Sequence, residues 1–338
     1  MAKLIQDGTI GMDTFPSVAS FAAAVGKMEG DGPLGHCFDY ITEDATLGEN
    51  SWEKSESKLQ QYAFSNALSK GGFSEKDIDV LFAGDLLNQC VSSSYGAKDT
   101  NVPFLGLFGA CSTMAESLGL ASIFVDGGMA VNAAAVTSSH FCSAERQFRF
   151  PVNYGGQRTP SAQWTATAAG CAVVSVHDKP PYVKAVTIGK IKDMGVTDAN
   201  NMGAAMATAA YDSISRHLAN TKQNVDDFDL ILTGDLGKVG SDILVELFRK
   251  DKVDISKKHN DCGLMLYDME KQDVHAGGSG CGCSASVLCG YILQELQQGK
   301  LRNVLFAATG ALMSPTIVQQ GESIPGISHV VHISADCC

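Results

Sequence analysis

The chain has 338 residues, of which 45% are hydrophobic and 18% charged, so it can bury two domain cores or one large duplicated core. Its formal net charge of −12 disfavours nucleic acid and anionic lipid headgroups as direct partners. Residues 1–28 show no basic region followed by an apolar run, and no apolar stretch is long enough to span a bilayer. The sequence therefore predicts a soluble protein that reaches membranes only through other proteins.

Eleven cysteines are scattered along the chain. An odd number of cysteines without an export signal predicts reduced thiols in a reducing compartment. The close pairs lack the repeated Cys-x-x-Cys spacing of structural zinc sites; they are Cys281 with Cys283 and Cys337 with Cys338. We therefore expect no metal and no cofactor.

A helical pattern over Trp52–Lys70 precedes the first predicted buried strand, Asp79–Phe82. This strand runs on to Gly84 and Asp85, and Asn88 follows at the strand end, where ligands of α/β sheets collect. Two interpretations stay open, because these side chains can reach a pocket or can anchor turns. Since Asp85 would repel an anion, we expect it to support a site from behind.

The next predicted strand, Phe104–Phe108, runs into a turn that we call the first elbow, Gly109–Ser112, and then into a helix over Ser117–Val125. Cys111 and Ser112 thus lie at a helix start, where unpaired backbone N–H groups favour anions and thiolates. This strand-to-helix turn is where a nucleophilic or an anion-binding cysteine would be positioned. A buried structural cysteine in a tight turn is the alternative.

A third predicted strand, Val131–Thr137, leads into Ser139 and His140. We expect both side chains at the same sheet edge as the first elbow, with His140 donating to a carboxylate or positioning the thiol. Arg146 and Arg149 follow, and arginines are the natural bidentate partners of carboxylates. A spacing of three residues also suits an exposed helical face, so their role stays open.

The same elements then occur a second time. Asp77–Leu86 matches Asp227–Leu236 without a gap, and Val131–Thr137 matches Asn303–Thr309. A helical pattern over Gly203–Asn220 precedes the second copy, as Trp52–Lys70 precedes the first. Strands that feed helices twice in one order predict an α/β protein of two related halves with mostly parallel strands.

We place the boundary between the halves in a proline-rich turn, which gives residues 1–178 and 179–338. In the second half, Cys283 opens a helical stretch in what we call the second elbow, Gly280–Ser284, and we expect it to match Cys111. His259 and Asn260 lie in a polar turn and are weaker candidates for pocket donors, because the turn can equally be an ordinary loop.

The first elbow resembles the nucleophile elbow of thiolases and ketoacyl synthases. The resemblance covers essentially the whole chain and implies a duplicated αβαβα fold, with two pseudo-symmetric halves and mostly parallel five-stranded sheets. Those enzymes also need His/His or His/Asn groups from the second half. Here Leu236–Val239 and the second elbow stand at the matching positions without them. We therefore expect Cys111 to be a vestigial nucleophile in a binding site and not in an active enzyme.

Seven further segments carry a closer resemblance: Asp31–His36, Ala83–Gln89, Leu107–Thr113, Ala144–Arg149, Lys258–Met265, Ala276–Cys281 and Thr309–Thr316. They are similar to a family of stage V sporulation proteins that bind dipicolinate. The resemblance implies binding of pyridine-2,6-dicarboxylate, free or as its calcium chelate, for movement into developing spores. It also implies membrane subunits of the same operon as partners, and attachment to the spore inner membrane through them. By analogy with thiolases, we expect a homodimer.

In a thiolase-like fold the helix starts at Cys111 and Cys283 are expected to converge. A small dianion could lie between them, stabilised by about 0.3–1 kcal/mol at each end. Two rival functions remain open. One is an acyltransferase or ketoacyl synthase that uses Cys111, and the other is a structural subunit with a vestigial pocket.

Overall fold

The computed structural model describes residues 1–149, 158–176 and 179–337. Its strands in the first half are β1 (Lys3–Gln6), β2 (Thr9–Gly11), β3 (Ser17–Gly26), β4 (Tyr40–Thr42), β5 (Val80–Gly84), β6 (Phe104–Leu107), β7 (Asn132–Ser139), β8 (Trp164–Thr165) and β9 (Ala168–Ser175). Those in the second half are β10 (Tyr182–Thr187), β11 (Leu230–Thr233), β12 (His259–Asp261), β13 (Gly278–Ser279), β14 (Asn303–Ala311) and β15 (Gly326–Ser334).

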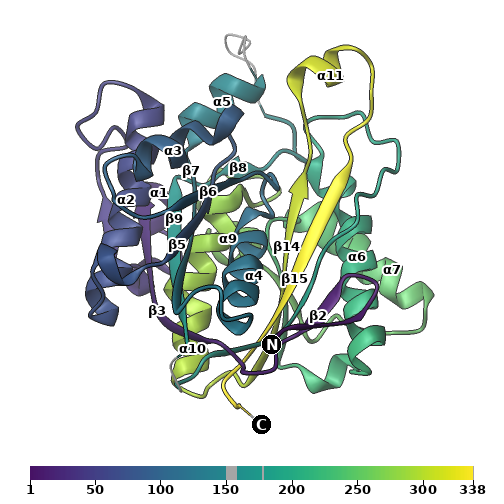
Figure 1. Cartoon of the computed structure of the whole chain (residues 1–338). Coiled ribbons are helices and arrows are strands. Elements are labelled where there is room, and N and C mark those ends of the chain that lie inside the picture. Colours follow the sequence, from purple (N-terminus) through teal and green to yellow (C-terminus); the bar gives the residue numbers. More distant parts are fainter. Residues whose placement is uncertain (150–157, 177–178, 338) are drawn as a thin grey trace.

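The helices cover and separate these strands (Figure 1). They are α1 (Lys27–Gly30), α2 (Trp52–Gly71), α3 (Val91–Ala97), α4 (Thr113–Asp126), α5 (Phe141–Arg149), α6 (Met202–Thr221), α7 (Gly237–Lys250), α8 (Cys262–Met265), α9 (Cys281–Val287), α10 (Leu293–Gln297) and α11 (Pro315–Gln319). A π-helical turn, Leu288–Ile292, joins α9 to α10. Within the described ranges, no helix has the length and apolar content to cross a membrane.

One large sheet contains both halves, with the main order β12-β11-β14-β15-β10-β3-β9-β7-β5-β6. Counted in chain order within each half, the strands lie in the order 3-2-4-5-1 in both. β9 and β15 run antiparallel to their neighbours, while the other four strands of each half share one direction. The predicted duplicated, mostly parallel α/β fold is therefore confirmed.

The two halves meet where β10 pairs with β3, at Tyr182 and Ser17. The boundary predicted between residues 178 and 179 falls at the edge of a gap in the described chain, and it stays a prediction. The last strand before it ends at Ser175 and the first strand after it begins at Tyr182.

Local sequence signals explain where the two long outer helices begin and end. The Ser51 hydroxyl accepts the Lys54 N–H at the start of α2, and the Asn201 side chain accepts the Ala204 N–H at the start of α6. Gly72, at φ +70°, ends α2 in the left-handed conformation that glycine adopts without strain. α2 covers the first half of the sheet and α6 covers the second (Figure 1).

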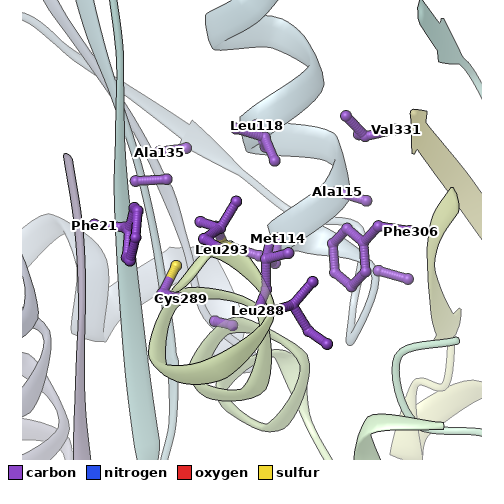
Figure 2. Close-up of a cluster of buried hydrophobic side chains, with 14 of the residues drawn as sticks. Phe21, Met114, Ala115, Leu118, Ala135, Leu288, Cys289, Leu293, Phe306 and Val331 are labelled. Carbon is purple, nitrogen blue, oxygen red and sulfur yellow. The ribbon is translucent and has the colours of Figure 1, made fainter. Parts of the chain in front are cut away.

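The middle layer is built from α4 and from α9 with α10, which lie between the two halves of the sheet. Figure 2 shows Met114 and Leu118 of α4 beside Leu288 and Leu293, with Phe306 of β14 closing the cluster. All five side chains are fully buried. Burying an apolar side chain of this size stabilises the fold by roughly 1.5–3 kcal/mol. This layer matters for function because both helices begin at the elbows.

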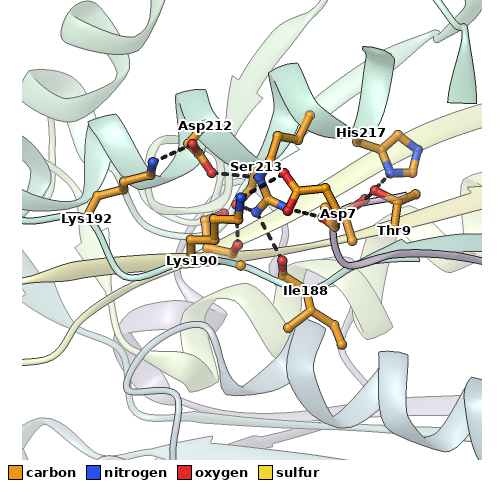
Figure 3. A network of polar contacts seen from close by, with 12 residues as sticks. Asp7, Thr9, Ile188, Lys190, Lys192, Asp212, Ser213 and His217 are labelled. Carbon is orange, nitrogen blue, oxygen red and sulfur yellow. Dashed lines mark hydrogen bonds and ion pairs between the residues drawn. The ribbon is translucent and has the colours of Figure 1, made fainter. Parts of the chain in front are cut away.

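A polar network fastens the N-terminal hairpin, β1 and β2, to the second half (Figure 3). β2 pairs with β10, and Arg216 of α6 donates to the carbonyls of Asp7 (2.7 Å) and Ile188 (3.0 Å). Lys190 binds the Asp7 carboxylate at 2.7 Å. The N-terminal hairpin therefore packs against the second half, although the strands that follow it belong to the first half.

Candidate functional site

A pocket opens beside Cys111, between the two halves of the molecule. It offers about 40 Å³ to the centre of a water molecule, which is room for a few ordered waters. Its walls are mostly apolar, and they come from Leu86, Phe108 and Phe148 of the first half and Met202 and Met313 of the second. A small, largely apolar pocket with a few polar groups is the usual form of a small-molecule site.

The first elbow turns sharply into α4, as the sequence predicts. Ala110 has φ +50°, a left-handed conformation that is uncommon for a residue other than glycine. The Ser112 hydroxyl donates to the Gly109 carbonyl at 2.6 Å, which closes the turn. A Cβ at Gly109 would lie 2.5 Å from a carboxylate oxygen of Glu116, so a larger residue there would require the Glu116 side chain to move. Ser112 is thus a buried part of the turn, and its hydroxyl is already used.

The second elbow uses Cys281, and the prediction of Cys283 as the counterpart of Cys111 is wrong. Gly280, at φ +101°, takes the position of Ala110, so the next residue matches Cys111. Cys281 belongs to the same buried cluster as Cys111, and its thiol lies 3.0 Å from the Ser138 carbonyl. Cys283 instead packs in the central core. A shift of two residues in a turn moves the side chain to another face of the helix.

Asp235, at the end of β11, joins the two elbows, and the sequence did not single it out as a pocket residue. Its carboxylate accepts the Thr309 hydroxyl (2.8 Å) and the Gly280 N–H (3.0 Å), and the Cys111 thiol lies within hydrogen-bonding reach. Burial raises the pKa of Asp235 to about 7, although the hydrogen bond from Cys111 and the other two donors lower it. The Gly-Asp pair that ends the strand in both halves is the sequence signal that could have identified Asp235.

Burial and this carboxyl group together change the chemistry of Cys111. Burial raises the pKa of the Cys111 thiol well above its usual value, and the charge of Asp235 raises it further. A thiol facing a carboxylate donates a hydrogen bond and stays protonated at neutral pH. This is the reverse of the cationic surroundings that activate a cysteine.

The helix starts converge as predicted, and two N–H groups at the second one are already used. The Gly280 N–H is taken by Asp235, and the Gly282 N–H by the Ser139 hydroxyl at 3.1 Å. Ser139 also donates to the Ala166 carbonyl at 2.7 Å, so it lies between strand and helix and does not open to the pocket. These two groups are therefore not available to a ligand, and the expectation that a dianion lies between the two helix starts stays a prediction.

Asp85 anchors a turn, which was one of its two predicted roles. Its carboxylate accepts the N–H groups of Leu87 and Ser93 (2.8 Å each) and the Ser93 hydroxyl (2.6 Å). Burial raises its pKa. Asn88 is exposed, and its backbone N–H donates to Gln147 at 2.9 Å. Neither lines the pocket at Cys111.

His140 lies away from Cys111, contrary to the prediction. Its Nδ1 accepts the Cys142 N–H at 3.1 Å, so Nε2 carries the proton and donates to the Ala45 carbonyl at 2.8 Å. The ring lines a separate cavity of about 420 Å³ with Trp164 and Lys27. Burial lowers its pKa, which suits a neutral ring that fastens a loop.

The remaining predicted residues lie outside the pocket as well. His259 and Asn260 are on β12, at the far edge of the sheet, where His259 contacts the Thr233 hydroxyl at 2.9 Å. Burial lowers the pKa of His259 to about 4. Arg146 is exposed and forms an ion pair with Glu53. The side chain of Arg149, the last residue of α5, lies outside the described part of the molecule.

The described lining of the Cys111 pocket contains no histidine, lysine or arginine. Besides the thiol, its polar members are Glu145, Thr165 and Ser279. Nor do the described residues contain a group of three or more His, Cys, Asp or Glu side chains placed to hold a metal ion. The described polar groups of the pocket are thus one thiol, two hydroxyls and one carboxyl group.

Comparison with known proteins identifies the family. Residues 6–334 match the model of the family described as stage V sporulation protein AD. The chain is 47% identical over 314 residues to stage V sporulation protein AD of Bacillus subtilis (strain 168), covering 93% of both chains. The chain belongs to the stage V sporulation protein AD family. Membership in this family assigns it a role in sporulation.

Solved structures show that the family shares the fold of thiolase-like enzymes. The 3-oxoacyl-[acyl-carrier-protein] synthase III of Aquifex aeolicus VF5 is 12% identical, with a TM-score of 0.57 over 94% of this chain and 99% of that one. Cerulenin-bound OleA of Xanthomonas campestris is 14% identical, with a TM-score of 0.61 over 96% of this chain and 97% of that one. At these identities the likeness concerns the fold alone.

Proposed function

We propose that this family member binds dipicolinate in the Cys111 pocket without converting it, as the free dianion or as its calcium chelate. Family membership and the resemblance to dipicolinate-binding proteins support the ligand. The mostly apolar walls of the pocket suit an aromatic ring. In this role the protein delivers the ligand for its movement into the developing spore.

The observation that carries the non-catalytic part of the proposal is Asp235 beside the Cys111 thiol. Acyl transfer needs a thiolate, a group that takes up its proton and donors for the thioester oxyanion. Here burial first, and the charge of Asp235 second, favour the protonated thiol, and the described pocket lining lacks an imidazole. The chain thus has the cysteine elbow, while the described pocket lining lacks the imidazole that would activate its thiol.

Two further parts of the proposal concern partners. The family resemblance supports membrane subunits of the same operon, which would hold the protein at the spore inner membrane. Among the described strands β6 is the last at its end of the main sheet, and its unpaired outer edge supports a homodimer. Leu105 on this strand and Phe108 just after it are 46% and 49% exposed. An exposed apolar strand edge is a template for pairing with another chain.

Calorimetric titration with dipicolinate and with its 3,5-isomer tests the binding function. We expect the 2,6-isomer to bind at least tenfold more tightly, because the pocket fixes the relative positions of ring and carboxylates. We expect Cys111→Ala to weaken binding by a modest factor, since the pocket walls remain. Equal affinity for the two isomers would instead indicate a structural subunit with a vestigial pocket.

The enzymatic rival has its own test. The wild-type protein is incubated with acyl-CoA, and the mass of the peptide that contains Cys111 is measured. We expect no thioester. Acylation of Cys111 followed by turnover would contradict the non-catalytic proposal and favour an acyltransferase.

A further inference from the structure

We propose that the hydroxyls of Thr165 and Ser279 hold one carboxylate of the ligand in the Cys111 pocket. The inference rests on the proposed function and names donors that neither the family resemblance nor the sequence pattern assigns. The two residues come from opposite halves of the chain and meet only in the folded molecule.

The two hydroxyls are neighbours by sheet register. β8 and β13 form a separate parallel pair in which Thr165 lies opposite Ser279. Neighbouring strands lie about 4.8 Å apart, and side chains in register point to the same face. Both residues line the Cys111 pocket. The two oxygens of one carboxylate can each accept one of these hydroxyls.

These hydroxyls differ from the others around the elbows. Ser112 donates to Gly109, Ser139 donates to Ala166, and Thr309 donates to Asp235. In the part of the chain that the structure describes, the hydroxyls of Thr165 and Ser279 have no intramolecular partner. A mostly buried hydroxyl needs a partner, so it is satisfied by a ligand or by water in the pocket.

The strand pair that carries them is held firmly. The Trp164 N–H donates to the Gly277 carbonyl at 2.8 Å, and the Ala166 N–H donates to the Ser279 carbonyl at 2.9 Å. The Gln163 side chain donates to the carbonyls of Asp235 (2.7 Å) and Gly278 (2.8 Å). The donors are therefore fixed before the ligand arrives, which reduces the entropy lost on binding.

The described donors of this pocket are neutral. Its described lining supplies no cationic side chain and includes the carboxyl group of Glu145, and Asp235 adds a second carboxyl group at the elbows. Hydrogen bonds to a charged group are stronger than those between neutral groups, so two hydroxyls can hold a carboxylate without an ion pair. The ring then lies against the apolar wall that includes Phe108 and Phe148. The ligand class is accordingly a small planar aromatic carboxylate.

The test is calorimetric titration of dipicolinate into wild type, Thr165→Val, Ser279→Ala and the double variant. Valine keeps the shape of threonine and removes the hydroxyl. We expect each single variant to bind roughly tenfold more weakly, as loss of a hydrogen bond to a charged group implies, and the double variant to bind more weakly still. Circular dichroism checks that each variant folds. If Thr165→Val does not fold, Ser279→Ala alone still tests whether a hydroxyl at this strand pair contributes to binding.

Thr208→Val is the matched control. Its hydroxyl on α6 is buried without a partner among the described residues, and it lies outside the Cys111 pocket. The control should bind dipicolinate like wild type. If wild type binds and the Thr165 and Ser279 variants bind equally well, the hydroxyl inference alone is overturned. If wild type does not bind dipicolinate, the proposed function fails, and the hydroxyl inference fails with it.

Discussion

The contact between Cys111 and Asp235 decides what the pocket can do at neutral pH. The Asp235 carboxylate accepts hydrogen bonds from the Cys111 thiol, the Thr309 hydroxyl and the Gly280 N–H. Three donors around one carboxylate favour its ionised form, and burial opposes ionisation. A charge at this position stabilises the protonated thiol. The same charge limits how closely a second anion can approach the elbow.

Replacing this charge should expose the reactivity of the cysteine. In Asp235→Asn the amide keeps the shape of the carboxyl and removes its charge, so the pKa of Cys111 should fall. We expect alkylation of Cys111 by iodoacetamide at pH 7.5 to become several-fold faster, because a larger fraction of the thiol is then ionised. Mass spectrometry of the peptide containing Cys111 measures the rate separately from the other cysteines.

Asp85→Asn is the control for this prediction, because Asp85 ends the matching strand of the first half. Its charge raises the pKa of Cys281 and is not among the leading influences on Cys111. It should leave the labelling of Cys111 unchanged. Equal labelling of Cys111 in wild type and Asp235→Asn would show that burial alone protects the thiol.

The sequence identified the elbow at Cys111, since a strand, a glycine-rich turn and a helix leave a local pattern. It could not identify Asp235, Thr165 and Ser279, because these side chains converge only through the topology of the sheet. It also misplaced the second cysteine. The second elbow holds both Cys281 and Cys283, and only the left-handed conformation of Gly280 decides between them.

Among the structural elements, α2, β7 and α5 are joined by one buried carboxyl group. Glu56 of α2 accepts the hydroxyls of Ser138 on β7 (3.2 Å) and Ser143 on α5 (2.7 Å). Burial and, after it, the charge of Asp85 raise the pKa of Glu56 to about 8. Since α5 carries the pocket residue Phe148, this carboxyl group supports one wall of the site.

The stability of the protein should therefore depend on the charge of Glu56. The folded state holds its proton up to about pH 8, while the unfolded state releases it near pH 4.5, so stability falls as pH rises through this window. Glu56→Gln removes this dependence. Between pH 5.5 and 8.5 we expect the free energy of unfolding to decrease in both proteins. The decrease should be about 1–3 kcal/mol smaller in Glu56→Gln than in wild type, since one pKa unit corresponds to about 1.4 kcal/mol.

Urea denaturation at several pH values measures this difference. Glu75→Gln, an exposed position outside the network, serves as the control and should follow wild type. Parallel pH profiles for wild type and Glu56→Gln would mean that Glu56 is ionised in the folded protein at neutral pH.

The long elements were predictable because apolar periodicity and the repeat support each other. The predicted helix Trp52–Lys70 corresponds to α2, and the predicted strand Asn303–Thr309 corresponds to β14. β8 and β13 contain two residues each and leave no periodic pattern. Their pairing, which places Thr165 opposite Ser279, exists only because distant segments meet.

At the scale of the whole molecule, the two ends of the main sheet differ in chemistry. β12 ends the sheet on one side with His259, Asn260 and Asp261. β6 ends it on the other side with the sequence Phe-Leu-Gly-Leu, which contains no charged residue to discourage pairing. The duplication that made the halves alike in topology therefore left them unlike at their edges.

We predict that two copies pair through β6 about a two-fold axis, which is the commonest symmetry of homo-oligomers. Leu105→Lys places a charge on this edge and should convert a dimer into a monomer, as measured by size-exclusion chromatography with light scattering. Asn260→Lys makes the corresponding change on the opposite edge and should remain dimeric. A monomeric wild type, or a dimeric Leu105→Lys variant, would contradict the prediction. Because Phe108 directly follows β6 and lines the Cys111 pocket, pairing at this edge would place a second copy near the ligand site.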